Sequence, residues 1–215
     1  MSVSLKGGAK VCYASGSIEV LVTRLDAQPE AVHALAATLS DAERQRAARF
    51  RFVRDRRRFI VARARLRELL AARLGVRPES IELAYGRYGK PELAGRFAGA
   101  GWRFNISHCE DVALHALCAG GEVGTDVEAI RPVREADRIA AGYFSCRENA
   151  AYRALPALDK PLGFLRCWTR KEAFVKALGG GLSSRLAQLD VSESSLVESF
   201  APLPGFIAAV ATPGA

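Results

Sequence analysis

The sequence has few of the features that tie a protein to a membrane or to an oxidising compartment. Its five cysteines are an odd number and none forms a C-x-x-C pair, so we interpret them as reduced thiols packed as small apolar groups. The first ten residues, MSVSLKGGAK, have no apolar run behind their lysines and do not resemble a leader peptide. The longest uncharged stretch, residues 199–215, is too short and too interrupted by proline to span a bilayer. We therefore expect a cytoplasmic protein without membrane association.

Acidic residues are in the minority. The 31 Lys and Arg residues outnumber the 23 Asp and Glu residues, which gives a net charge of +8 and a pI of about 9.6. Such a balance favours a polyanionic partner: nucleic acid, lipid, a phosphorylated cofactor or an acidic protein. Twelve arginines lie between residues 44 and 73 against two acids, so a nucleic-acid-binding module is an alternative function. Aromatic residues are only 8%, however, and no platform for stacking single-stranded bases is evident.

The order of predicted elements indicates an α+β fold. Alternating and β-branched segments predict strands at residues 17–25, 81–86, 102–107, 112–118, 122–128, 186–191 and 206–211. Apolar residues at helical spacing predict helices at 29–39, 41 onward, 56–74, 134–142, 145–154 and 161–178, with residues 87–93 as a loop. The elements interleave without a regular strand–helix–strand rhythm, which argues against a doubly wound sheet. The glycine-rich connection at 119–122 divides the chain into predicted halves, 1–119 and 120–215.

The arginine-rich segment is predicted to be helical. Ser40 and Glu43 fit a capping box, and Asp55 fits the cap of a further helix that ends at Gly75. One stripe of this second helix is apolar: Phe59, Ala62, Leu66, Leu69, Leu70 and Leu74. We expect most arginines on its remaining surface to be solvated and a few to bind phosphate.

The stretch VGTDVE, residues 123–128, places two carboxylates on one strand. Residues i and i+2 of a strand project from the same face, so Asp126 and Glu128 point the same way. Two like charges this close raise each other's pKa unless a cation intervenes, and such oxygen ligands suit Mg²⁺. The alternative is that both side chains face solvent on an edge strand.

A second chemical cluster lies in CWTRKEAFVKALGGGL, residues 167–182. Trp168, Glu172 and Lys176 are spaced four apart and therefore share one helix face, ahead of the glycines at 179–181. A surface Glu–Lys pair is the ordinary alternative. In FNISHCED, residues 104–111, His108 is either a phosphate-binding cation, a general base or a half-exposed turn histidine. His115 is seven residues away and is expected on the opposite face, which argues against a paired histidine metal site.

Taken in order, these motifs resemble the 4′-phosphopantetheinyl transferases. VGTDVE followed about forty residues later by WTRKEAFVK is similar to the signature pair of that family. YGKPEL (residues 88–93), FNISH and YFSCRE, whose last residue is Glu148, resemble three further motifs in the right order. The length is typical of the larger single-chain type that activates surfactin synthetase and related carrier proteins. The resemblance implies two similar α/β halves that form a pseudo-dimer, with the active site in the cleft between them.

The resemblance also implies a reaction and a set of residues. Such enzymes transfer the phosphopantetheine arm of coenzyme A to a serine of an apo acyl or peptidyl carrier protein, with Mg²⁺, and release 3′,5′-ADP. The residues that match the family's metal ligands are Asp126, Glu128 and Glu172. Those that match its phosphate contacts are Lys90, Ser107, His108 and Lys176, with His108 associated with the 3′-phosphate. The basic helical region for coenzyme A is matched by Arg44, Arg46 and Arg58.

The chemistry of the transfer is consistent with these assignments. Phosphoryl-linked transfer needs positioning and charge neutralisation, and the serine hydroxyl needs a base. Glu148 and Glu172 are both candidates for that base, directly or through a metal-bound water. A basic surface would attract an acidic carrier protein. We also expect the protein to be a monomer and not to act on nucleic acid. Cys109 stands where the family commonly has serine, and we expect it to alter a local hydrogen bond.

Overall fold

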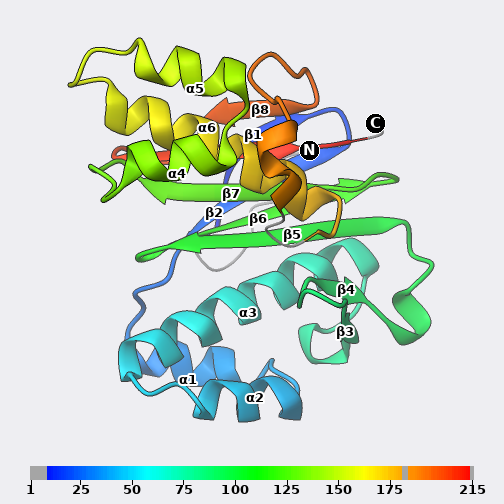
Figure 1. The fold of residues 1–215 in the computed structure, drawn as a ribbon. Helices are drawn as coiled ribbons and strands as arrows, with labels where there is room; N and C mark the ends of the chain where they lie inside the picture. The colour runs from blue at the N-terminus through cyan, green and yellow to red at the C-terminus, as the bar shows by residue number, and fades with distance from the viewer. Residues whose placement is uncertain (1–8, 181–183, 214–215) are drawn as a thin grey trace.

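Two antiparallel sheets lie between two groups of helices in the computed structural model (Figure 1), which describes residues 9–180 and 184–213. This arrangement confirms the α+β fold class. Helix α3 covers the outer face of one sheet, with α1 and α2 packed against it, and α6 covers the outer face of the other, with α4 and α5 packed against it. The residues on which the leader-peptide expectation mainly rests, and also Gly181 and Leu182, lie outside the described ranges.

The first sheet has four strands in the order β1-β2-β6-β5, and each neighbouring pair is antiparallel. Their bounds are Lys10–Ser15, Ile18–Arg24, Val112–Ala119 and Trp102–Cys109, in that order. Strands β2, β5 and β6 were predicted from the sequence, whereas β1 was not. β1 is an edge strand with a register shift between Val11 and Tyr13, so its side chains do not alternate cleanly between core and solvent.

The helices beneath this sheet are α1 (Pro29–Ala36), α2 (Asp41–Ala48) and α3 (Val53–Leu74). The predicted capping box at Ser40 is present, and Gly75 ends α3 with a φ of 66°. The predicted cap at Asp55 is wrong, because Phe52 precedes the first turn and Asp55 lies inside it. Most arginines of residues 44–73 are exposed, as expected, whereas Arg63 and Arg67 are buried.

Short elements connect α3 to the sheet. The strands β3 (Leu83–Tyr85) and β4 (Pro91–Leu93) form a small hairpin, flanked by the 3₁₀ turns Pro78–Ser80 and Gly95–Phe97. Residues 91–93 were predicted as loop, and this is wrong because they pair with β3.

The second sheet has three strands in the order β7-β9-β8, with bounds Gly124–Ala129, Phe206–Ala211 and Val197–Phe200. Its helices are α4 (Ala136–Tyr143), α5 (Cys146–Arg153) and α6 (Lys160–Ala177). Strands β7 and β9 and all three helices were predicted, and β8 was not. The predicted strand at 186–191 is wrong, because this segment begins in a 3₁₀ turn, Ser184–Gln188, and joins no sheet.

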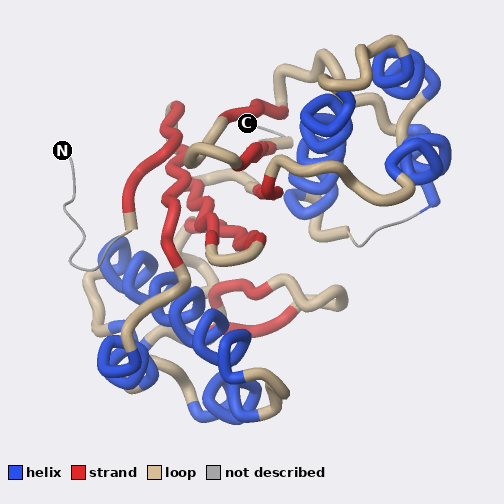
Figure 2. The backbone as a smooth tube through the Cα atoms, turned by 90° about the vertical axis from the view of Figure 1, so that its left-hand side faces the viewer, coloured by secondary structure: helices blue, strands red, loops and turns tan. Residues whose placement is uncertain are grey.

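Apolar contacts join the layers in sequence. Val112, Leu114 and Ala116 of β6 pack against Val127 and Ala208 of the second sheet, so the two sheets face each other. Leu66, Leu69 and Leu70 of α3 fill the interface beneath the first sheet, and Ala173 and Ala177 of α6 lie over β9. Figure 2 shows the same arrangement from the side, with the strands between the two helical groups. Within the described ranges, none of the helices combines the length and the apolar character needed to cross a membrane.

Candidate active site

Polar side chains join strand β5 of the first sheet to strand β7 of the second. The Asn105 side-chain oxygen accepts a hydrogen bond from the backbone N–H of Thr125 at 3.0 Å, and the Ser107 hydroxyl donates to Asp126 Oδ1 at 2.8 Å. One step further, the Cys109 thiol donates to Glu128 Oε2 at 3.3 Å. The two strand ends therefore run side by side in one direction, and the predicted carboxylate pair lies at this junction.

Helix α6 adds the third carboxylate. Its residues Trp168, Glu172 and Lys176 share one face, as predicted, and that face meets β7. Gly124 makes the close approach possible, because a Cβ at this position would clash with the backbone of Ala173 and Ala177. A glycine in VGTDVE thus brings the helix onto the strand that carries Asp126 and Glu128.

Together these elements enclose a pocket of about 340 Å³. Its charged or polar lining residues are Ser107, His108, Asp126, Glu128, Glu172 and Lys176, alongside Trp168. Burial raises the pKa of Glu172, and the negative charges of Asp126 and Glu128 raise it further, against the opposing effect of Lys176. Burial and the charge of Asp126 likewise raise the pKa of Glu128. The site thus holds three carboxylates, two of which, Glu128 and Glu172, have a raised pKa.

The oxygen atoms of this pocket fit a hard divalent cation. Asp126 is only 5% exposed, and its Oδ2 has no hydrogen-bond partner within the described residues; nor has Glu172 Oε1. Unpaired buried carboxylate oxygens are costly unless a cation or a donor reaches them. In the described residues no three His, Cys, Asp or Glu side chains already converge as a metal site. Instead, the Lys176 ammonium lies 2.6 Å from Asp126 Oδ1.

A larger pocket of about 710 Å³ adjoins the first and shares Ile106 and His108 with it. Its lining includes three arginines and two phenylalanines: Arg46, Arg58, Arg63, Phe50 and Phe59. Arg46 lies over the Phe59 ring at 5.4 Å, and Arg58 forms two hydrogen bonds with Asp26. A basic, partly aromatic cavity of this kind suits a phosphorylated nucleotide.

Comparison with known proteins identifies the family. Residues 26–119 match the family described as 4′-phosphopantetheinyl transferase, N-terminal, and residues 122–202 match the 4′-phosphopantetheinyl transferase superfamily. The chain is 41% identical over 166 residues to the 4′-phosphopantetheinyl transferase HetI of a Nostoc species, a match that covers 77% of this chain and 70% of HetI. It is 37% identical over 158 residues to the 4′-phosphopantetheinyl transferase AcpT of Escherichia coli K12, with 74% and 76% covered.

A vertebrate protein is also similar. The match to the L-aminoadipate-semialdehyde dehydrogenase-phosphopantetheinyl transferase of Xenopus laevis is 30% identical over 163 residues and covers 71% of this chain and 53% of that protein. The chain belongs to the 4′-phosphopantetheinyl transferase superfamily. It is therefore a transferase, as the ordered motifs predicted.

Arg63 of this transferase was not among the predicted site residues. Its side chain is 9% exposed, lines the larger pocket, and lies between the rings of Phe59 and Tyr85 at 5.8 and 5.7 Å. Its buried Nη1 has no hydrogen-bond partner in the described residues. Phe59, Arg63 and Arg67 are four apart, so their shared helix face was the sequence signal that could have found it.

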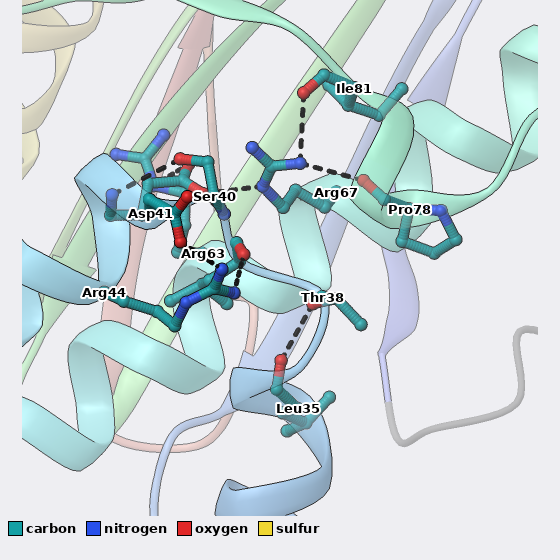
Figure 3. Close-up of polar contacts among 11 residues, drawn as sticks. Leu35, Thr38, Ser40, Asp41, Arg44, Arg63, Arg67, Pro78 and Ile81 are labelled. Carbon is teal, nitrogen blue, oxygen red and sulfur yellow. Dashed lines mark hydrogen bonds and ion pairs between the residues drawn. The ribbon is translucent and has the colours of Figure 1, made fainter.

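The buried acid beside Arg63 is shared with a second arginine. Glu43 lies 3.6 Å from Arg63 Nε but 2.7 Å from Arg67 Nε, so one carboxylate serves two guanidinium groups. Figure 3 shows Arg67 directed at the carbonyls of Pro78 and Ile81, to which it donates at 2.9 and 3.0 Å. Arg67 thus uses its Nε and Nη1 donors, whereas the buried Nη1 of Arg63 is unused within the described residues.

Three predicted site residues lie outside the two pockets of the transferase. Arg44 donates to Asp41 and to the Leu39 carbonyl beside α2 (Figure 3). Lys90 donates to Glu122 at 3.1 Å and to the Ala177 carbonyl at the end of α6.

Glu148, the third of these residues, contacts Lys171 and so lies against a different face of α6 from the one that carries Glu172. Its carboxylate accepts hydrogen bonds from the backbone N–H groups of Ser145 and Val191, both at 2.8 Å, and lies 2.7 Å from the Lys171 ammonium. Both charged side chains are buried. The structure therefore does not bring the two candidate bases together.

The two histidines share one face of the first sheet, which corrects the prediction that they face opposite sides. In the β5–β6 hairpin Ile106 pairs directly with His115, and His108 pairs with Ala113. Directly paired residues point to the same face of a sheet, and so do residues two apart on one strand, so His108 lies on the same face as His115. His115 is buried beneath α3, 3.0 Å from the Ala62 carbonyl, whereas His108 reaches both pockets. Burial lowers the pKa of His108, and the positive charge of Lys176 lowers it further.

Proposed function

We propose that this transferase moves the 4′-phosphopantetheine arm of coenzyme A to a serine of an apo acyl or peptidyl carrier protein, with Mg²⁺ and with release of 3′,5′-ADP. The observation that carries the proposal is the junction at His108 of a pocket with three carboxylates and a basic, aromatic pocket. The first suits a metal-bound diphosphate, and the second suits the nucleotide to which it is attached.

The residues take distinct roles in this proposal. Asp126, Glu128 and Glu172 would hold Mg²⁺, which when bound neutralises the diphosphate and stabilises the departing phosphate. Arg46, Arg58 and Arg63 orient the nucleotide, and His108 contacts its 3′-phosphate at the boundary of the pockets. Lys176 and Ser107 lie at the diphosphate. Arg44 and Lys90 remain proposed coenzyme contacts that would have to exchange their present partners for phosphate.

The transfer forms one bond and breaks one. The carrier serine oxygen bonds to the phosphorus that bears the pantetheine arm, and the bond from that phosphorus to the bridging oxygen of 3′,5′-ADP breaks. The serine proton passes to a base. Glu172 is better placed than Glu148, because it lines the pocket, has a raised pKa and keeps an unpartnered buried oxygen. One chain supplies both pockets, so we propose that a monomer is active.

The nucleic-acid alternative has less support. It rests on the arginines, yet Arg63 and Arg67 are buried and Arg58 is paired with Asp26. A phosphorylated small molecule accounts better for arginines that point into a cavity than a polymer that needs them on a surface.

Mass spectrometry of carrier proteins tests the proposal. A panel of purified apo carriers incubated with coenzyme A and Mg²⁺ should include one that gains about 340 Da, the mass of the transferred arm. Asp126→Ala and Glu172→Ala should abolish the gain while circular dichroism remains that of the wild type. Glu193→Ala, which removes an exposed carboxylate, is the matched control. No gain with any carrier, or a near-normal rate in either site variant, would refute the assignment.

The choice of base has its own test. We expect Glu172→Gln to lose at least about a hundredfold in kcat, because general-base contributions are typically of this size. Glu148→Gln should lower the midpoint of urea unfolding, because it leaves the buried Lys171 ammonium without its carboxylate. The variant molecules that remain folded should keep kcat within about threefold of wild type. The reverse pattern would make Glu148 the base.

A further inference from the structure

We infer that Cys109 is a positioning residue that orients the Glu128 carboxylate for the divalent cation. The inference rests on the proposed function, because it assigns a role to a side chain that supports one of the proposed metal ligands. Cys109 ends β5, directly opposite Val112 in the hairpin, and its side chain crosses to the end of β7.

The sulfur of Cys109 makes two contacts with β7 that fix the direction of its proton. It accepts a hydrogen bond from the backbone N–H of Ala129 at 3.4 Å, and it lies 3.3 Å from Glu128 Oε2. An amide N–H only donates, so the sulfur lone pairs serve Ala129 and the S–H is left for the carboxylate.

Ser107 and Cys109 form a matched pair of supports. They are two residues apart on β5 and donate to Asp126 and Glu128, which are two residues apart on β7. Asp126 has a further partner in Lys176, whereas Cys109 is the one hydrogen-bonding partner of the Glu128 carboxylate within the described ranges. Without the thiol, only the packing of its CH₂ groups would orient the Glu128 carboxylate. Loss of the thiol should therefore weaken binding of the cation and leave binding of the nucleotide unchanged.

Divalent-ion binding without coenzyme A or carrier gives a readout that does not depend on catalysis. Titration with Mn²⁺, followed by its electron paramagnetic resonance signal, should show about tenfold weaker binding for Cys109→Ala, the usual cost of removing a group that orients a metal ligand. Cys109→Ser replaces the thiol donor with a hydroxyl donor and should keep Mn²⁺ binding within about threefold of wild type. The KM for coenzyme A should stay unchanged in both variants.

Cys12→Ala is the matched control. Cys12 packs against the same core cluster as Cys109, but its thiol donates to the Val20 carbonyl away from the pocket. It should bind Mn²⁺ as the wild type does. Wild-type binding by folded Cys109→Ala, or binding by Cys109→Ser as weak as that of the alanine variant, would overturn the inference. If the Mn²⁺ pattern holds but no carrier is modified, the transfer proposal fails and the positioning role stands.

Discussion

At the scale of single residues, the Lys176 ammonium lies where the proposed metal ion would bind. Its ammonium donates to Asp126 Oδ1 at 2.6 Å and to the Ser107 hydroxyl at 3.2 Å. A lysine in this position partly neutralises the three carboxylates in the absence of a cation. In the proposed function a divalent ion would take over that role and the ammonium would be free to turn to the diphosphate, so one side chain would serve two states of the site.

Removal of Lys176 should therefore strengthen the binding of the metal ion and weaken the binding of coenzyme A. We expect Lys176→Met to bind Mn²⁺ alone more tightly than wild type, by about threefold to tenfold, since a positive charge near the site has gone. The KM for coenzyme A should rise by about tenfold, the value of one charged contact. Lys160→Met, which removes a lysine paired with Asp137 outside the pocket, should change neither value. Weaker Mn²⁺ binding by Lys176→Met would contradict this account.

His115 makes the stability of the fold depend on pH. It is completely buried, and burial lowers its pKa from 6.5 to about 4. The unfolded chain therefore binds a proton at pH 5 that the folded protein excludes. The stabilising contribution of neutral His115 is complete above pH 6.5 and is lost as the pH falls towards 4, to a total of about 3 kcal/mol.

Urea unfolding at pH 7 and at pH 5 measures this effect. We expect wild type to lose free energy of unfolding at pH 5 by more than His115→Gln does, because glutamine has no proton to gain. His33→Gln removes a side chain at the surface of α1 and should leave the pH dependence as in wild type. Equal pH dependence in wild type and His115→Gln would show that His115 titrates normally in the folded protein.

At the scale of elements, the contact between α6 and β7 sets the geometry of the carboxylates. Gly124→Ala would place a methyl group against the backbone of Ala173 and Ala177, which cannot move away without the whole helix. We expect this variant to lose about 1–3 kcal/mol of stability, the usual cost of overpacking, and to lose most of its Mn²⁺ binding as Glu172 moves away from Asp126. In Gly121→Ala the added carbon meets only the Cys118 sulfur at 3.6 Å, so it is the matched control. Normal Mn²⁺ binding by folded Gly124→Ala would argue against this role of the contact.

Local sequence patterns predicted the helices and the longer strands but missed the strands β1, β4 and β8. The capping box at Ser40 and the glycine after α3 depend on neighbouring residues alone, and both were confirmed. The segment 186–191 was predicted as a strand from its apolar residues, but its backbone groups are used by side chains. The Lys171 ammonium donates hydrogen bonds to the carbonyls of Leu186 and Leu189, and the Glu148 carboxylate accepts one from the N–H of Val191. A buried ion pair from other elements thus decides this conformation.

The same distinction separates the site residues. The spacing of Asp126 with Glu128, and of Glu172 with Lys176, was sufficient to place each pair on one face. Cys109 and Arg63 depend on which strand lies beside β5 and on which aromatic rings enclose α3, and a local pattern contains neither fact.

At the scale of the whole molecule, the arginines form a buried group and an exposed group. Arg63 and Arg67 are buried around Glu43, while Arg49, Arg51 and Arg56 are exposed. Each sheet has its own helical group, yet one sheet has four strands and the other three, so the close similarity of the two halves remains a prediction. Arg67 supports the fold through Glu43 and two backbone carbonyls. In the proposed function Arg63 would bind the nucleotide, and the exposed arginines would create a field that the carrier protein meets first.

This field predicts how transfer should respond to salt. An acidic carrier protein is attracted over a Debye length of about 10 Å at 0.1 M salt, and over about 3 Å at 1 M. We expect kcat/KM for the carrier to fall by about tenfold or more over this range, mainly through a higher KM, because steering accelerates encounter rather than chemistry. A carrier variant with its surface acids replaced by amides should start with a lower kcat/KM and respond only weakly to salt. If both carriers respond equally, the salt acts on coenzyme or metal binding inside the pockets, and the exposed arginines have no part in recruiting the carrier.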